Sequence, residues 1–194
     1  VNITMGLSLK TTLLASLFTA LFQLHKGKTK GGWFYKDVLL FLSNPYTKRL
    51  SGPSSLPFQL VKFIRAENII YLTDKHLAEF LDKYPLDFNI FPQNVSTPQE
   101  MNAFFISIIL RLKAFFQKEG NALELEYLYA FFTLFNTLEK TLQNANYIEN
   151  IETLHAFYKQ MVTTESLDFL GSPINGLQVM GMLESRTLDF ETVV

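Results

Sequence analysis

Residues 97–120 read TPQEMNAFFISIILRLKAFFQKEG, and this stretch decides the fold class. Thr97 suits the N-cap, Pro98 the first helical position, and Glu100 completes a capping box three residues after the threonine. Gly120 suits the end of the helix. Between them, apolar side chains recur every three or four residues, which predicts one long amphipathic helix. These side chains are Met101, Phe104, Phe105, Ile108, Ile109, Leu112 and Phe115.

Similar spacing recurs along most of the chain, so the sequence predicts a mainly α protein. Asn44-Pro45 is expected to stop one helix, Thr73 to cap the start of another, and Pro85 to end it. Residues 69–72 (IIYL) suit either a short strand or the lead-in to the next helix, and no fixed repeat indicates a solenoid. The body is predicted to be an irregular helical bundle, with further helices at 11–25, 33–43, 58–68, 74–84, 122–144 and 148–162.

Composition limits the kinds of function that the chain can have. With 19 Phe and only 18% charged residues among 194, it can bury a large core, which argues against disorder. A formal net charge of −1 gives no overall attraction to nucleic acid or membranes, so such contacts require a local patch. The nearest candidate for a membrane span, residues 101–110, is cut short by Arg111 and Lys113. The absence of cysteine fits a reducing compartment, and we expect a cytoplasmic protein with no membrane partner.

The sequence Lys26-Gly27-Lys28-Thr29 matches the end of a phosphate-binding P-loop. A P-loop needs a glycine five residues earlier, where this chain has Phe22, and it must follow a strand and open a helix. This segment instead closes a predicted helix, which favours a solvated basic turn. We still expect weak contacts between the phosphate backbone of DNA and four lysines, namely Lys26, Lys28, Lys30 and Lys36.

No constellation of residues indicates catalysis or metal binding. The three histidines, His25, His76 and His155, lie far apart and outside any metal-binding spacing, so we expect surface or interfacial roles. Glu124 and Glu126 are two residues apart on a helix, point to different sides and are expected to be solvated. No Asp or Glu is followed two positions later by Lys, so half of a metal-dependent nuclease site is missing. The sequence predicts no catalytic residue, metal or cofactor in this chain.

Residues 177–194, LQVMGMLESRTLDFETVV, resemble motif V of superfamily-one DNA helicases of the UvrD/RecB type. That motif is an apolar strand, a polar turn, and Gly-Leu-Glu-Phe followed two residues later by Val. Leu177-Gln178-Val179-Met180 matches the strand, Leu188-Asp189-Phe190 the turn, and Val193 the resumption of the strand. The nearest resemblance is to AddB-like helicase–exonucleases of the PD-(D/E)xK nuclease family from Bacteroidetes. VNITMGLSL, residues 1–9, is similar to the point where that family's RecA-like domain gives way to an inserted helical subdomain, called 2B.

This resemblance implies a division of the chain into three parts. Residues 1–9 would be the edge of a RecA-like host domain, 10–170 the inserted 2B-like subdomain, and 171–194 the return into the host. The chain would be a piece of a longer enzyme that processes DNA ends in double-strand break repair. Its ATP- and magnesium-dependent helicase and exonuclease activities would reside in the flanking RecA-like and nuclease domains. The insert itself would be non-catalytic, guide DNA and contact a partner helicase–nuclease subunit.

The carry-over of individual DNA-binding residues is partial. Gly181 stands where active helicases have a DNA-contacting Thr, and Leu183 stands where they have His. Arg186 keeps the positive charge of the family's Lys, and Asp189 keeps the acid on a shorter arm. The resemblance therefore implies DNA contacts at Gly181, Arg186 and Asp189 and suits a scaffold better than a motor.

A free-standing helical module that binds other proteins is the alternative hypothesis. The two hypotheses differ in what they predict for the ends of the chain. Insertion requires residues 1–4 and 177–180 to lie close together as paired strands, whereas a free-standing module requires no kinship between them.

Overall fold

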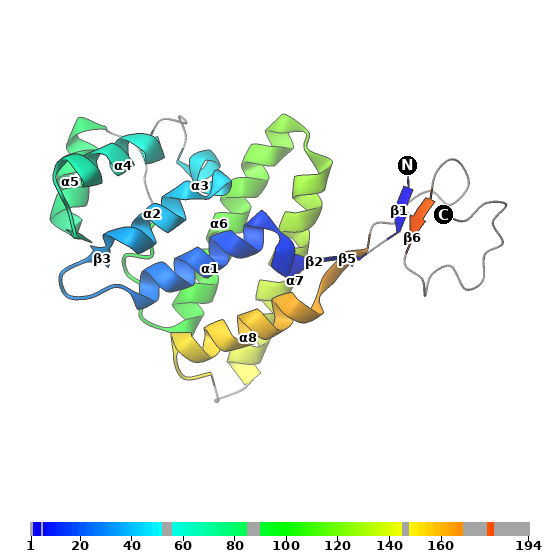
Figure 1. The fold of residues 1–194 in the computed structure, drawn as a ribbon. Helices are drawn as coiled ribbons and strands as arrows, with labels where there is room; N and C mark the ends of the chain where they lie inside the picture. Colours follow the sequence, from blue (N-terminus) through cyan, green and yellow to red (C-terminus); the bar gives the residue numbers. More distant parts are fainter. Residues whose placement is uncertain are drawn as a thin grey trace.

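The computed structural model describes residues 2–4, 6–51, 56–84, 90–144, 148–168 and 178–180. Over these residues the protein is mainly helical, with eight α-helices and three two-stranded pairs. Figure 1 shows a helical body on one side and strands β1 and β6 apart from it, joined to the body through β2 and β5. The mainly α prediction is confirmed.

The longest helices, α6 (Pro98–Glu119) and α7 (Ala122–Asn144), form an antiparallel hairpin. The capping box is present, because the Glu100 amide donates to Thr97 Oγ1 at 3.2 Å and Glu100 Oε2 accepts from the Thr97 amide at 3.0 Å. Gly120 ends α6 with a φ of +69°, a left-handed conformation that glycine adopts without strain. The local signals in the sequence therefore placed the two helices correctly, and their packing into a hairpin is a finding of the structure.

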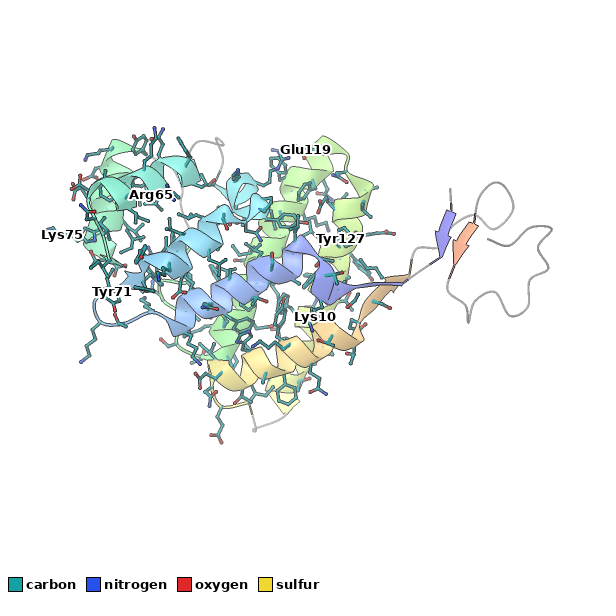
Figure 2. All side chains as sticks on the ribbon, viewed as in Figure 1. Lys10, Arg65, Tyr71, Lys75, Glu119 and Tyr127 are labelled. Atoms are coloured by element: carbon teal, nitrogen blue, oxygen red, sulfur yellow. The ribbon has the colours of Figure 1, made fainter. Side chains whose placement is uncertain are left out.

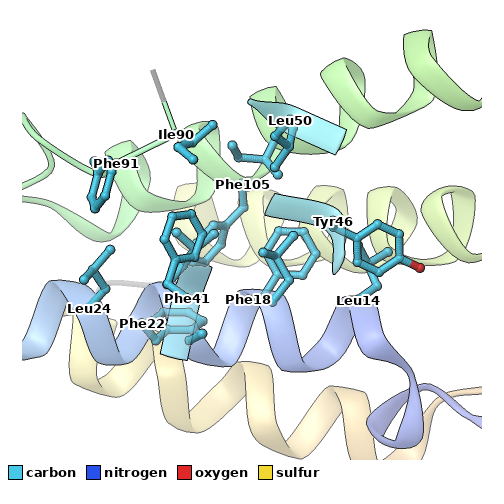
Figure 3. Packing of buried hydrophobic residues seen from close by; sticks show 14 of the residues in the cluster. Leu14, Phe18, Phe22, Leu24, Phe41, Tyr46, Leu50, Ile90, Phe91 and Phe105 are labelled. Carbon is cyan, nitrogen blue, oxygen red and sulfur yellow. The ribbon is translucent and has the colours of Figure 1, made fainter. Parts of the chain in front are cut away.

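Helix α1 (Leu13–Lys26) crosses the middle of the body, and α8 (Ile151–Thr164) runs beside it. Phe18 of α1 is fully buried, and its ring centre lies 5.1 Å from that of Phe105 in α6 and 4.8 Å from that of Phe135 in α7. Figure 3 shows Phe18 and Phe22 within the cluster that also contains Phe105. Aromatic side chains thus join α1 to the α6–α7 hairpin in one core.

The shorter elements show where the sequence-based boundaries were wrong. Trp33–Phe34 is strand β3, and helix α2 spans Tyr35–Ser43, so helix 33–43 began two residues too early. β3 pairs with β4 (Tyr71–Leu72) in antiparallel register, which settles residues 69–72 in favour of a short strand. Asn44-Pro45 does end α2 but also starts an unpredicted helix α3 (Pro45–Leu50), because Asn44 Oδ1 accepts a hydrogen bond from the Tyr46 amide.

Three further helices differ from their predicted bounds only at the ends. Helix α4 spans Leu56–Ala66 and α5 spans Asp74–Lys83, with Thr73 as the N-cap that the sequence predicted. Helix α8 begins at Ile151 rather than at residue 148, because Asn150 Oδ1 caps it by accepting from the Thr153 amide at 2.8 Å. Local capping residues therefore set the starts of α5 and α8.

Two strand pairs join the early and late parts of the chain. Strand β1 (Asn2–Thr4) pairs in parallel with β6 (Gln178–Met180). Strand β2 (Gly6–Ser8) pairs antiparallel with β5 (Ser166–Asp168); this pair was not predicted, and a single 3-10 turn, η1 (Leu9–Thr11), links β2 to α1. The expectation that residues 1–4 and 177–180 lie together as paired strands is confirmed by the β1–β6 pair, which joins residues 2–4 to residues 178–180.

Candidate nucleic-acid interface

Residues 26–36, here called the lysine loop, leave the end of α1 and return through β3 into α2. Lys26 Nζ lies 3.1 Å from Glu152 Oε1 at the start of α8. Lys28 Nζ donates a 2.7 Å hydrogen bond to the Gln93 carbonyl and lies 4.7 Å from the centre of the Trp33 ring. These contacts link the lysine loop to the body: Lys26 forms a solvent-exposed ion pair, and Lys28 donates to a neutral carbonyl and keeps its charge.

Lys30 lies at the tip of a tight turn within the lysine loop. The backbones of Thr29 and Gly32 exchange two hydrogen bonds of 3.0 Å, so only Lys30 and Gly31 lie between them. Lys36 lies in the first turn of α2. Both lysines are exposed, and neither forms an ion pair with any residue that the structure describes. Of the four predicted lysines, Lys30 and Lys36 are the two that make neither an ion pair nor a side-chain hydrogen bond with the described residues.

Aromatic rings lie directly beside this turn. The Phe34 ring centre lies 5.0 Å from that of Tyr35 and 5.8 Å from that of Tyr71 across the β3–β4 pair. A methyl group placed on Gly31 would be 4.0 Å from Tyr71 Cγ, so the turn that carries Lys30 packs next to the tyrosine. Tyr71 remains 42% exposed. The pairing of β3 with β4 thus brings an accessible aromatic face to the lysine loop.

Two further cations occupy the same end of the molecule. Figure 2 shows Arg65 of α4, Lys75 of α5 and Tyr71 at the same end of the body, away from strands β1 and β6. The sequence indicated their helices but not that they share an end of the body with the lysine loop, because that arrangement depends on β3 pairing with residues almost forty positions later. Exposed cations bind phosphates, and aromatic faces stack on unpaired bases. The chemistry of this end of the body therefore suits a single nucleic-acid strand.

The resemblance to motif V implies a second set of DNA contacts. Gly181, Arg186 and Asp189 lie outside the described residues. Of the motif, the structure describes only strand β6, Gln178–Met180.

The segment Lys26-Gly27-Lys28-Thr29 has the context of a helix end. Helix α1 precedes it, β3 follows it, and the Gly27 amide donates to the Gln23 carbonyl within the last turn of α1. An ATP phosphate would need the opposite order of elements and free amides, so the residues here do not fit ATP. Among the described residues, no group of three His, Asp or Glu side chains could hold a metal ion. No step of ATP or magnesium chemistry is assigned to this chain.

Each histidine makes a structural contact. His25 Nε2 lies 3.0 Å from the Val95 carbonyl, and His76 Nδ1 accepts from the Thr73 amide as part of the cap of α5. The His155 ring stacks on Phe22, with the ring centres 4.3 Å apart and the planes 13° apart. Burial lowers the pKa of His155 to about 4, and nearby lysines add to the shift. This imidazole is therefore neutral near pH 7.

The expectation that Glu124 is simply solvated was wrong. Tyr46 Oη of α3 donates a 2.5 Å hydrogen bond to Glu124 Oε2 of α7. Burial and this carboxylate together raise the pKa of Tyr46. Glu126 is exposed, as expected. The contact therefore links α3 to α7.

Comparison with known proteins found no family model, no curated protein and no solved structure that matches this chain. The candidate interface is therefore supported only by the positions and contacts of its own residues. None of the helices in the described ranges combines the length and apolar character needed to cross a membrane.

Proposed function

We propose that the helical body is a non-catalytic insert of a larger AddB-like helicase–exonuclease, in which it guides DNA during the processing of double-strand breaks. One observation carries this proposal, namely the parallel pairing of β1 with β6. Parallel neighbours require a crossover connection, and here the crossover contains the whole helical body. A pair of three-residue parallel strands is too small to be stable alone and is typical of a larger sheet covered on both faces.

The second strand pair supports the same architecture. Strands β2 and β5 run antiparallel, so the chain leaves the β1–β6 pair and returns to it through two adjacent strands. The lysine loop, Tyr71, Arg65 and Lys75 lie at the opposite end of the body. An insert built this way presents its cations and aromatic rings at a distance from its host, which suits a guide for a DNA strand.

DNA binding by the purified chain tests the guiding role. Trp33 is the single tryptophan, is fully buried and lies under Lys28, so its fluorescence reports on the lysine loop. Titration with a labelled oligothymidylate of 20 nucleotides should give weak, salt-sensitive binding by fluorescence anisotropy, together with a change in Trp33 emission. Lys30→Ala and Lys36→Ala should each reduce the salt slope by about 0.7, the value for one phosphate contact on a single strand.

Lys113→Ala is the matched control, because Lys113 is an exposed lysine that borders the groove between α6 and α7 and lies outside the lysine loop. It should change affinity by less than twofold. Binding that depends equally on all three lysines, or that does not weaken with salt, would contradict the assignment of Lys30 and Lys36.

Parentage is tested by reading the coding sequence on both sides of the codons for Val1 and Val194. The proposal expects a continuous frame, with a P-loop upstream and an Asp…Glu-x-Lys nuclease constellation downstream. A stop codon directly after Val194 would refute it. The purified chain should hydrolyse neither ATP nor DNA, and magnesium-dependent turnover that follows the protein through gel filtration would contradict the non-catalytic role.

A free-standing protein-interaction module is the second candidate, and exposed apolar side chains favour it. Leu110 and Tyr129, on adjacent faces of α6 and α7, are 50% and 72% exposed and line a groove with Leu125. Such a surface is typical of contact with another protein.

A further inference from the structure

A groove of about 660 Å³ runs along the outer face of α1. Its floor includes Ser16 and Thr19, one wall is formed by Leu40 and the start of α3, and the other by Val162 and neighbouring residues of α8. Leu13 and Leu40 line it while remaining 57% and 52% exposed. The groove therefore offers apolar surface that nothing among the described residues covers.

Hydrogen bonds from both walls fix the shape of the groove. Asn44 Nδ2, from the junction of α2 and α3, donates to the Leu13 carbonyl at 3.1 Å and to Ser16 Oγ at 2.9 Å. On the other side, Tyr158 Oη of α8 donates to the Ala15 carbonyl at 3.1 Å. Because α1 is tied to each wall, the groove is preformed, and a ligand need not pay for opening it.

The charges that line the groove have one sign. Lys10 lies beside the first turn of α1, and Lys159 lies on α8. No carboxylate lines the groove, and neither lysine forms an ion pair within the described ranges. The surface is thus apolar along its length with uncompensated positive charge at its margins, which is complementary to an apolar ligand with acidic flanks.

The dimensions of the groove favour a helix as that ligand. From Leu13 to Ala20, the lining part of α1 extends about 12 Å at 1.5 Å per residue, which matches two to three turns of a partner helix. No strand lines the groove, so an added strand would find no free backbone edge to pair with. Helices on both sides leave instead a channel into which the side-chain ridge of another helix can pack.

We propose that this groove binds an amphipathic α-helix of a partner protein, one with an apolar face and acidic residues along its margins. The proposal rests on the groove alone and does not require the chain to be a helicase insert. Nucleic acid is a poorer match for this surface, since two lysines neutralise few phosphates and no exposed aromatic ring lines the groove.

Peptide titration tests the proposal in the absence of DNA. The probe is a fluorescein-labelled 14-residue helical peptide with leucines on one face and glutamates beside them; a second peptide carries lysines in place of the glutamates. Fluorescence anisotropy should show saturable binding of the acidic peptide and at least fivefold weaker binding of the basic one. The double variant Lys10→Glu, Lys159→Glu should weaken the acidic peptide about tenfold, as expected for reversing two exposed charges.

Two variants locate the binding. Thr19→Tyr fills the floor of the groove from an exposed position and should abolish binding while the circular dichroism spectrum is unchanged. Lys113→Glu is the matched control, because Lys113 borders the separate groove between α6 and α7, and it should have less than a twofold effect.

Several results would overturn the proposal. They are equal binding of both peptides, binding insensitive to Thr19→Tyr, loss of binding in Lys113→Glu, and no saturable binding below 1 mM peptide. Concentration-dependent dimerisation that Thr19→Tyr abolishes would also overturn it, since a second copy of the chain would then occupy the groove.

Discussion

Acidification from pH 7 to pH 4 should destabilise the helical body through His155. Its ring stacks on Phe22, and its Nε2 atom is buried without a hydrogen-bond partner in the described part of the chain. Lys26 and Lys159 face the same cleft, as do the carboxylates of Glu149 and Glu152. Burial first, and then the two lysines, hold the pKa of His155 at about 4, below its ordinary 6.5.

The sign of the effect follows from which state binds the proton first. As pH falls below 6.5, the unfolded chain protonates this histidine while the folded chain keeps it neutral, so the free energy of unfolding decreases until the pH reaches about 4. At about 1.4 kcal/mol for each pH unit, the full difference sets an upper limit of roughly 3 kcal/mol. Because the ring is only partly buried, solvent screening reduces the expected loss to about 1–2 kcal/mol.

Urea unfolding at pH 7, 5.5 and 4.5, followed by circular dichroism, measures this loss. His155→Phe is the control, because it keeps an aromatic ring against Phe22 and removes the titrating group; losses from other side chains then cancel in the comparison. The gap in unfolding free energy between wild type and variant should shift by about 1 kcal/mol or more between pH 7 and 4.5, in favour of the variant. A parallel pH dependence in both proteins, or an NMR titration of His155 near 6.5, would refute the reasoning.

Three mutations test the packing and capping described above. Phe18→Ala should lower the free energy of unfolding by about 3–5 kcal/mol, because the ring is fully buried; Phe58→Ala, 58% exposed, should stay within about 0.5 kcal/mol, and urea unfolding compares the two. Gly32→Ala should disrupt the β3–β4 pair, since glycine has a φ of +108° there and a methyl group would lie 2.3 Å from the Leu72 carbonyl oxygen. Gly31→Ala is its tolerated counterpart, and a change in Trp33 emission in the first variant alone is the expected readout. Thr97→Ala should cost about 1 kcal/mol in urea unfolding through loss of the α6 cap, and an unchanged stability would contradict that role.

Elements that depend on nearby residues could be predicted from the sequence. Helix α6 follows from a capping box, a period of three and four, and a glycine, all within one stretch of chain. Strand β3 shows the opposite case. Trp33 and Phe34 continue the apolar spacing of α2, but pairing with Leu72 and Tyr71 holds them extended, and a partner so distant in sequence leaves no local signal.

The same distinction explains the candidate interface. The sequence identified four lysines in one segment but could not say which of them form contacts with the rest of the body. The partner of Lys26 is Glu152, and the acceptor for Lys28 is the backbone of residue 93. Both contacts form only after the helices have packed. Tyr71 likewise comes close to Gly31 only in the folded chain. The sequence therefore identified the cations of this surface but not its aromatic component or the contacts that position Lys26 and Lys28.

The β2–β5 pair, the lysine loop with Tyr71, and the α1 groove are three separate surfaces of the body. Their separation is the strongest argument for the proposal that the body connects two partners. The β2–β5 pair lies at one end of the body and joins it to strands β1 and β6, and the lysine loop and Tyr71 lie at the other end. The α1 groove runs along the first turns of α1, between these two ends. A nucleic-acid strand at the far end and a helix in the groove would use different residues, so binding of one need not exclude the other. Coupling between them would have to pass through α1, whose last turn leads into the lysine loop and whose first turns form the groove floor. If α1 behaves as a rigid element, Thr19→Tyr should abolish peptide binding and leave the affinity for oligothymidylate unchanged. A matching loss of DNA affinity would instead show that the two surfaces are coupled.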